Sequence, residues 1–270
     1  MIYFPNAKIN IGLNITEKRN DGFHNIETIF YPIGLSDILE INASKNKTSF
    51  KNTGLSVENM DFESNICYEA YNILSHDFPI KPVNIHLYKI IPFGAGLGGG
   101  SSDASFTLKA LNSIHKLNLD NSALLNYAEK IGSDCPFFIL NKPCFATEKG
   151  NVLKPIDLNL KGYYFVLISP NIHINTAKAY SAITPKRPKT SLQELIKQPI
   201  EKWKKTFKND FEDSVFRDHS ELKEIKNHLY SLGAIYASMS GSGSSIFGIF
   251  DNKIDLGNNF KKHFIWTEVL

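Results

Sequence analysis

The stretch Pro92-Phe-Gly-Ala-Gly-Leu-Gly-Gly-Gly-Ser-Ser102 contains five glycines among the seven residues from Gly94 to Gly100. Glycine lets the backbone adopt positive φ angles and approach a ligand closely, because it has no Cβ. Alternating apolar residues at 83–87 precede the stretch, and apolar residues at helical spacing follow it at 104–114. A glycine loop that opens a helix directs N–H groups and the positive helix end towards one point. The stretch therefore predicts a phosphate-binding loop between a strand and a helix.

The pattern of this glycine loop leaves the kind of phosphate ligand open. No lysine follows the glycines, so the loop is not a Walker A loop. Residues 94–99 satisfy G-x-G-x-x-G, and Asp120 follows about 20 residues on, so a dinucleotide-dependent oxidoreductase is an alternative. Asp120 lies in a polar stretch and not at the end of a strand. Pro92 and the hydroxyls of Ser101 and Ser102 favour a nucleoside triphosphate with magnesium, since hydroxyls donate to phosphate and ligate hard cations.

Hydrophobic periodicity predicts the other elements. Alternation predicts strands, and helical spacing predicts a helix over 64–75, with Ser64 as its N-cap, and another over 121–131. The expected strands cover residues 9–15, 26–30, 37–41, 83–87, 163–168, 234–237 and 246–250. A second glycine turn, Ser238-Met-Ser-Gly-Ser-Gly-Ser-Ser245, joins the last two strands. This turn is either an ordinary hairpin turn or a second phosphate-compatible loop.

Composition limits the class of protein. The chain has 270 residues, of which 42% are hydrophobic and 21% charged, as in soluble globular proteins. A net charge of +3 is too small to argue for a nucleic-acid partner. Cys67, Cys135 and Cys144 show neither disulfide-framework nor zinc spacing, which indicates a reducing compartment. No signal peptide is visible, and no apolar run approaches the roughly 20 residues that cross a bilayer, so we expect a cytoplasmic protein without a membrane partner.

Charge divides the chain near residue 150. Residues 1–150 carry a net charge of −2, and residues 151–270 carry +5. We expect a domain boundary there. The segment from Lys186 to Lys208 is locally basic and contains Ser191-x-x-Glu194, a capping-box pattern. It is either a solvated helical face or a surface for an anionic ligand or partner.

Three isolated side chains are candidates for chemistry. Asp134 lies between Gly132 and the apolar residues up to Phe138, and a carboxylate with such flanks could orient or deprotonate a hydroxyl. It could equally be an ordinary helix-terminal aspartate. Lys8 shares a strand face with polar neighbours and could neutralise a carboxylate or a phosphate, or simply be exposed. His24 follows a turn, where an isolated histidine is usually a surface residue.

Taken together, these segments resemble the 4-diphosphocytidyl-2-C-methyl-D-erythritol kinases of the GHMP kinase superfamily. The segments that carry the resemblance occur in the family's order: Pro5–Leu13, Asp21–His24, Pro92–Ala104, Gly132–Phe138 and Met239–Gly243. The resemblance implies an α+β, two-domain GHMP kinase fold. Residues 1–150 would form a ribosomal-S5-like domain that binds ATP, and residues 151–270 a smaller C-terminal domain with an antiparallel sheet.

The resemblance also implies a reaction. ATP would phosphorylate the 2-hydroxyl of 4-diphosphocytidyl-2-C-methyl-D-erythritol and give the 2-phosphate and ADP, in non-mevalonate isoprenoid biosynthesis. Mg²⁺ is expected with the nucleotide, and no protein ligand of a metal is assigned. The expected partners are this cytidylated substrate and ATP. Two further readings stay open: a GHMP kinase acting on homoserine, mevalonate or a sugar, and a silent nucleotide- or RNA-binding module, since S5-like folds occur in ribosomal proteins.

Site residues follow from the resemblance by matched position. Asp134 matches the catalytic aspartate, which acts as base or orienter, and Lys8 matches the lysine beside it. Candidate ATP-binding residues are Pro92, Phe93, Gly94, Ala95, Gly96, Leu97, Gly98, Gly99, Gly100, Ser101, Ser102, Asn65 and Lys89. Candidate substrate-binding residues are Asn10, Phe23, His24, Thr176 and Tyr180. Phe23 stands where the family commonly has tyrosine, so ring stacking on cytosine is retained while a phenol hydroxyl is not.

Overall fold

The computed structural model describes residues 1–55 and 65–270. The chain forms two compact units, each discontinuous in sequence. Unit 1 comprises Met1–Ala7, Leu35–Phe93 and Gly98–Lys142, and unit 2 comprises Lys8–Gly34, Gly94–Leu97 and Pro143–Leu270. The glycine loop therefore contributes Gly94–Leu97 to unit 2 and its helix to unit 1. The division at residue 150 stays a prediction.

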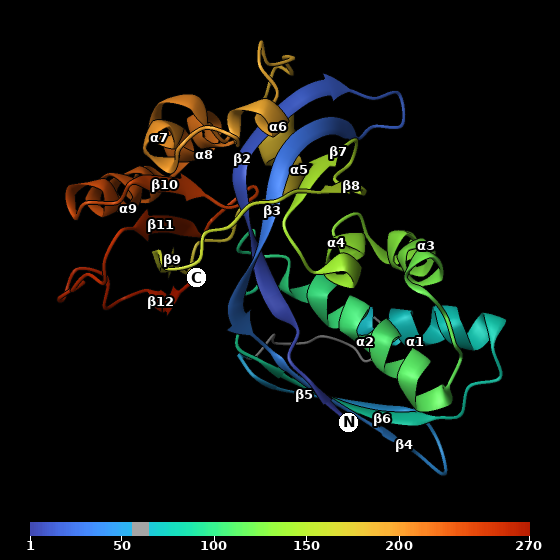
Figure 1. Cartoon of the computed structure of the whole chain (residues 1–270). Helices are drawn as coiled ribbons and strands as arrows, with labels where there is room; N and C mark the ends of the chain where they lie inside the picture. Colours follow the sequence, from blue (N-terminus) through green and yellow to red (C-terminus); the bar gives the residue numbers. More distant parts are fainter. Residues whose placement is uncertain (56–64) are drawn as a thin grey trace. The chain divides into compact units, whose positions relative to one another are not determined.

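Unit 1 is a four-stranded sheet with helices on one face (Figure 1). The strand order is β1 (Ile2–Tyr3), β4 (Ile38–Ala43), β6 (Val83–Lys89) and β5 (Ser49–Gly54). β5 is parallel to β6, and the other neighbours are antiparallel. The helices are α1 (Ile66–Asp77), α2 (Gly99–His115), α3 (Asn121–Ile131) and α4 (Cys135–Leu140). Their apolar faces and the inward residues of β4 and β6 form one core.

Two helices of unit 1 were predicted from the sequence, and their capping residues mark their ends. Asp120 accepts a hydrogen bond from Ala123 N, and Gly132 follows the last turn of α3, so the predicted helix over 121–131 is confirmed. The predicted helix over 64–75 is found as α1, and its N-cap is Asn65, whose side chain accepts from Cys67 N. Ser64 lies outside the described residues.

Unit 2 contains two four-stranded sheets. One has the order β2 (Asn6–Lys18), β3 (His24–Ser36), β7 (Cys144–Thr147) and β8 (Val152–Pro155), where the first two residues of β2 and the last two of β3 belong to unit 1. The other is antiparallel throughout, with the order β10 (Tyr236–Met239), β11 (Ile246–Phe250), β9 (Tyr164–Ser169) and β12 (Phe264–Val269). Every residue of β9 is buried, as its continuous apolar run predicts.

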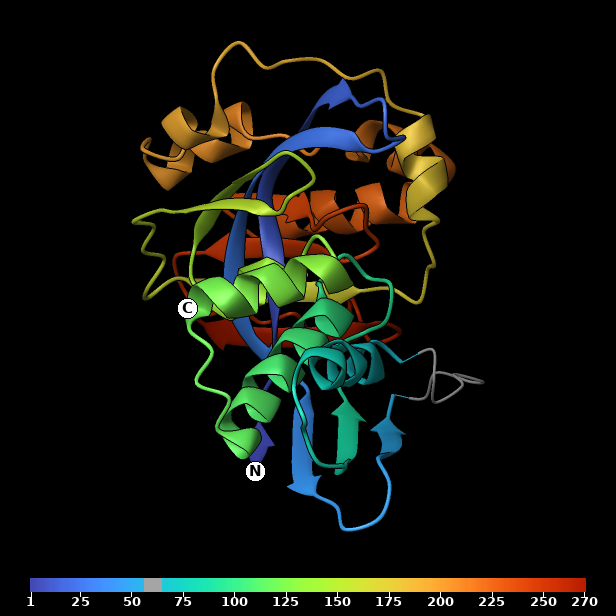
Figure 2. The same cartoon turned by 90° about the vertical axis from the view of Figure 1, so that its right-hand side faces the viewer.

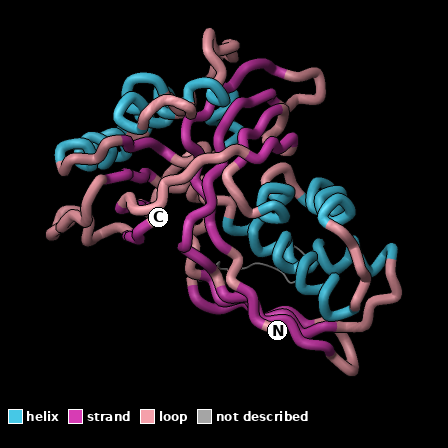
Figure 3. Tube along the Cα trace, in the orientation of Figure 1, coloured by secondary structure: helices cyan, strands magenta, loops and turns pink. Residues whose placement is uncertain are grey.

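Helices pack against the two sheets of unit 2 (Figures 2 and 3). They are α5 (Thr176–Ser181), α6 (Leu192–Leu195), η2 (Ile200–Lys202), α7 (Trp203–Thr206), α8 (Glu212–Asp218) and α9 (Ser220–Ser231). Leu222, Ile225 and Leu229 of α9 pack against the sheet that contains β10 and β11. Ser191 is the N-cap of α6, as predicted, and its hydroxyl accepts from Gln193 N. Among the described residues, no helix has the length and apolar character needed to cross a bilayer.

Candidate active site

The first turn of α2 in unit 1 presents the features of a phosphate-binding helix end. Its N-cap is Gly98, which has a left-handed backbone with φ +70° and makes no side-chain capping bond. The N–H groups of this turn are therefore not taken by a capping side chain. Ser102 is fully buried, and its Oγ has no hydrogen-bond partner within residues 1–55 and 65–270. An uncapped helix end and an unsatisfied hydroxyl both fit phosphate oxygens and the cation that accompanies them.

In unit 2, the glycine-loop residues Gly94–Leu97 lie against the turn between β10 and β11. The hydroxyl of Ser240 donates to the carbonyl of Gly96 at 2.8 Å. Ser245 N donates to Ala95 O at 3.2 Å. A Cβ on Gly96 would lie 2.0 Å from Ser240 O, and the φ of Gly96 is +77°. Both the backbone angle and this close approach require glycine. The turn is confirmed as a hairpin turn, since β10 and β11 are antiparallel, with Met239 opposite Ile246.

Lys8 and Asn10 of β2 form a buried polar cluster with the same loop. Lys8 is 3% exposed, and its ammonium donates to Asn10 Oδ1 at 2.7 Å and to Gly96 O at 3.2 Å. Asn10 Nδ2 donates to Thr28 Oγ1 at 2.9 Å, and Thr28 donates onward to Gly12 O. The structure therefore brings Lys8, Asn10 and Gly96 together. Lys8 is a buried cation on the glycine loop, and the alternative of an exposed strand face is wrong.

Asp134 lies in unit 1 at the junction of α3 and α4. It is the N-cap of α4, so its position is that of a helix-terminal aspartate. Its side chain makes no capping bond and is half-buried. The helix that follows is packed into unit 1 through Cys135, Pro136 and Phe137, which are all buried. A rigid apolar helix thus fixes a carboxylate that does not cap it.

Lys89 and Asn65, the two other predicted nucleotide contacts, are both buried in unit 1. Lys89 Nζ pairs with the carboxylate of Asp37 and, at 2.6 Å, with that of Asp103. All three side chains are at most 2% exposed. The two carboxylates raise the pKa of Lys89 against the opposing effect of burial, and burial raises the pKa of Asp103 well above its usual range. Asn65 is 5% exposed and caps α1.

The predicted substrate residues are grouped in unit 2. The rings of His24 and Tyr180 are stacked, with centroids 4.9 Å apart and planes 19° apart. Burial and the charge of Lys18 lower the pKa of His24, so the neutral imidazole is favoured near pH 7. Thr176 begins the helix that carries Tyr180, and its hydroxyl lies 3.1 Å from that of Ser242. The structure thus brings His24 and Tyr180 together.

Phe23, the residue before His24, has an exposed side chain. Its side chain is 59% exposed, and the Lys149 ammonium lies 5.1 Å from the ring centroid. An exposed aromatic ring on a turn offers a face for a planar base. The Arg19–Asp21 ion pair and the bond from Phe23 N to Asp21 Oδ1 hold the turn itself.

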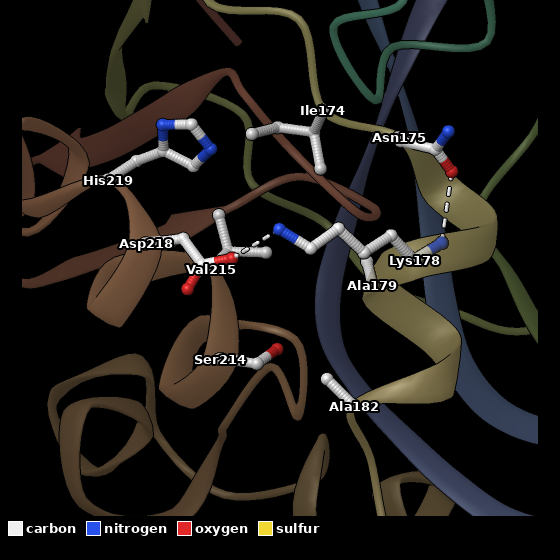
Figure 4. Close-up of a pocket in the computed structure, with 9 residues that line it drawn as sticks. All are labelled: Ile174, Asn175, Lys178, Ala179, Ala182, Ser214, Val215, Asp218 and His219. Atoms are coloured by element: carbon white, nitrogen blue, oxygen red, sulfur yellow. Dashed lines mark hydrogen bonds and ion pairs between the residues drawn. The ribbon is translucent and has the colours of Figure 1, made fainter.

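Unit 2 also has two cavities that other residues line. The smaller, of about 60 Å³, lies between α5 and α8, where Lys178 reaches Asp218 at 3.0 Å (Figure 4). It is large enough for water but too small for a nucleotide. The larger, of about 360 Å³, lies between the ends of β2 and β3 and the segment that contains Arg187. None of the predicted site residues lines either cavity.

The glycine loop, its helix and the C-terminal turn together define a class of protein. The sequence model of the GHMP kinases N terminal domain matches residues 65–142, which include the loop and α2. The model of the GHMP kinases C terminal domain matches residues 191–264, which include the turn that holds Gly96. The class is thus that of the GHMP kinases, and the chain is a small-molecule kinase.

Individual relatives narrow this class. The 4-diphosphocytidyl-2-C-methyl-D-erythritol kinase of Bacteroides fragilis is 54% identical over 253 residues, which cover 93% of this chain and 92% of that protein. The kinase of the same name from Parabacteroides distasonis is 51% identical over 268 residues and covers 98% of both chains. A crystal structure of 4-(cytidine 5'-diphospho)-2C-methyl-D-erythritol kinase superposes with a TM-score of 0.81 at 29% identity, covering 99% of this chain and 98% of that one. The chain therefore belongs to the 4-diphosphocytidyl-2-C-methyl-D-erythritol kinase family.

Proposed function

We propose that this protein transfers the γ-phosphoryl group of ATP to the 2-hydroxyl of 4-diphosphocytidyl-2-C-methyl-D-erythritol, in non-mevalonate isoprenoid biosynthesis. The observation that carries the proposal is the 54% identity over 93% of the chain to a kinase named for that substrate. The buried Lys8 on the glycine loop supports it, because a silent binding module has no need of a desolvated cation there.

ATP would bind through the glycine loop. The uncapped N–H groups at the start of α2 would hold the triphosphate, in accord with the affinity of helix N-termini for anions. Mg²⁺ would neutralise charge on the phosphates. Among the described residues no group of three or more His, Cys, Asp or Glu could hold a metal ion, and Mg²⁺ typically keeps its phosphate and water ligands. The hydroxyl of Ser102 would be its candidate contact on the protein.

The transfer itself needs an aligned nucleophile and neutralised charge more than covalent chemistry. In this proposal the substrate 2-hydroxyl oxygen attacks the γ-phosphorus, the bond to the ADP oxygen breaks, and the hydroxyl proton passes to Asp134. Asp134 would also hold the hydroxyl in line. Lys8 would stabilise negative charge during the transfer, and its bond to Gly96 O ties that charge to the loop.

The cytidine would be recognised by aromatic side chains. Phe23 offers an exposed ring for stacking, and His24 offers a neutral imidazole to the cytosine edge. Tyr180 stacks on His24 and would fix its orientation, with Thr176 and Asn10 as further polar contacts.

Asn65 and Lys89 remain proposed nucleotide contacts. An ammonium has three N–H donors, and two of those on Lys89 go to Asp37 and Asp103, which leaves one for a nucleotide. The three cysteines are all buried free thiols, which supports a reducing compartment, and we place the reaction in the cytoplasm.

The test is ADP release from ATP and Mg²⁺ with and without 4-diphosphocytidyl-2-C-methyl-D-erythritol. Homoserine, mevalonate and galactose serve as acceptor controls. Release that requires the cytidylated substrate supports the proposal. Release with another acceptor only would reassign the substrate within the GHMP kinases. ATP binding without turnover, together with salt-sensitive RNA binding, would favour the binding module instead.

A further inference from the structure

Asn209 is a buried residue of unit 2 that neither the loop motif nor the proposed chemistry uses. It lies between α7 and α8 and is 3% exposed. Its neighbours pair with β2: Leu13 N donates to Lys208 O at 2.8 Å, and Asp210 N donates to Leu13 O at 2.9 Å. The Asp210 carboxylate also accepts from Ile15 N. The segment that carries Asn209 is therefore fixed to the strand that carries Lys8 and Asn10.

The carboxamide of Asn209 uses both N–H bonds and its oxygen. Nδ2 donates to Met239 O and to Gly241 O, each at 2.8 Å. Oδ1 accepts from Phe211 N at 3.0 Å. A side-chain amide has two donors and one acceptor oxygen, so aspartate, which lacks the donors, cannot reproduce this set. Asn209 thus holds the carbonyl on each side of Ser240.

Ser240 is the residue that the clamped turn presents to the glycine loop. Its hydroxyl donates to Gly96 O at 2.8 Å and accepts from Asn10 N at 3.3 Å. The ammonium of Lys8 bonds to the same Gly96 carbonyl. A movement of the turn would therefore displace Ser240, which is a hydrogen-bond partner of both Gly96 and Asn10.

The strand before the turn is held separately. Glu212, the first residue of α8, accepts from Met239 N at 2.9 Å and pairs with Lys226. Since Glu212 fixes the end of β10, loss of the Asn209 carboxamide would release the turn without releasing the sheet. The loss would free Met239 O and Gly241 O in the turn, and also Phe211 N at the start of α8.

We propose that Asn209 is a positioning residue for phosphoryl transfer: its carboxamide fixes the turn of residues 239–241, so that Ser240 holds Gly96 and the glycine loop in the form that binds the ATP phosphates. The inference rests on the proposed function for the identity of the nucleotide. It adds a residue about 110 positions from the glycine motif in sequence, in a segment whose only sequence signal is its basic neighbours.

The experiment measures binding of a non-hydrolysable ATP analogue with Mg²⁺, and the KM for ATP and kcat, in Asn209→Ala, Ser240→Ala and the double variant. Each single change should weaken analogue binding about tenfold, the ratio that a well-placed hydrogen bond corresponds to. The double variant should bind the analogue no more weakly than whichever single variant binds it less tightly, because both changes act through one contact. Asn209→Asp keeps the size and the acceptor of asparagine and carries the same test if Asn209→Ala does not fold.

Asn112→Ala is the matched control. Asn112 also bonds through its carboxamide to a loop, at Leu119 N and O, but at the far end of α2. The Asn112→Ala variant should have a lower thermal unfolding midpoint and an unchanged KM for ATP. Unchanged analogue binding in Asn209→Asp, or additive losses in the double variant, would overturn the proposal. Analogue binding needs no acceptor, so a wrong acceptor assignment leaves this test intact.

Discussion

Both the side chain and the backbone of Ser240 lie against Gly96. The Ser240 hydroxyl donates to Gly96 O at 2.8 Å, while the Ser240 carbonyl leaves no space for a Cβ on Gly96. Gly241 adds a third close approach, since its own Cβ would lie 3.2 Å from Gly96 Cα. The C-terminal turn thus supports one side of the glycine loop, and the loop depends on residues from the far end of the chain.

Gly96→Ala should strongly lower the activity of the kinase. The Cβ would lie 2.0 Å from Ser240 O, so the loop or the turn must shift, and alanine is strained at φ +77°. A shift of about 1 Å in the loop should lower kcat/KM for ATP by about 100-fold. Gly257→Ala is the control, because Gly257 also has positive φ, +54°, but nothing lies within 4 Å of its Cβ. Equal activity in the two variants would show that the contact with Ser240 does not matter.

Asp134→Asn and Lys8→Met should each lower kcat by roughly 10²–10⁴-fold while the protein stays folded. The first removes the proton acceptor, and the second removes the charge that bonds to Gly96 O. The measurement is ADP release alongside the thermal unfolding midpoint. Asp120→Asn and Lys109→Met are the matched controls: Asp120 caps α3, and Lys109 is a partly buried lysine that bonds to Phe138 O. Near-wild-type turnover in both site variants would reject the proposed roles.

Local sequence signals predicted the central residues of the candidate site. The glycine loop, the alternation around Lys8 and the apolar flanks of Asp134 are all contained in short segments. The helix over 121–131 was predicted for the same reason, as were seven strands: β2, β3, β4, β6, β9, β10 and β11. The short strands β1, β5, β7 and β8 were not predicted. α9 was not predicted, although Leu222, Ile225 and Leu229 stand at helical spacing. β12 was also not predicted, because Ile265 and Val269 lie on its exposed face and Glu268 on its covered face, so its sequence lacks the alternation of a half-buried strand.

The side-chain partnerships could not be predicted from the sequence. Lys89 finds Asp37 at a separation of 52 residues, and Asn209 finds Gly241 at 32. Periodicity identifies which face of an element is buried, but it does not identify which buried polar groups meet. Those partners are set by strand order and by the packing of the helices, which the pattern of one chain does not encode locally.

Asp103→Asn should flatten the dependence of stability on pH. Burial raises the pKa of Asp103 above its ordinary value of 3.8, so above that pH the folded state binds more protons than the unfolded chain. The free energy of unfolding of the wild type therefore falls as the pH rises from about 4 towards the folded pKa. Asparagine does not ionise, so the variant lacks this loss. Urea unfolding at several pH values between about 4 and 7 measures the difference.

Asp37→Asn is the contrasting variant of the same cluster. The Asp37 carboxylate accepts from Ile90 N at 2.5 Å and Ile91 N at 2.9 Å as well as from Lys89. Loss of this charge should cost about 3–5 kcal/mol, the usual effect of breaking a buried ion pair. If Asp103→Asn destabilises the protein equally, the two carboxylates have the same role and our assignment of the raised pKa to Asp103 is wrong.

Phe23→Ala should raise the KM for the cytidylated substrate by about 10-fold, because stacking of a base on an aromatic ring is worth roughly 1–3 kcal/mol. The kcat at saturation should stay within about threefold, since in our proposal the ring contributes binding rather than chemistry. Phe23→Tyr adds a phenol hydroxyl and keeps the ring, so its KM should match the wild type. A lower KM in Phe23→Tyr would show that the phenol hydroxyl makes a contact that this chain lacks. An unchanged KM in Phe23→Ala would exclude the exposed ring from the cytidine site and leave the stacked pair of His24 and Tyr180 as the aromatic surface for the base.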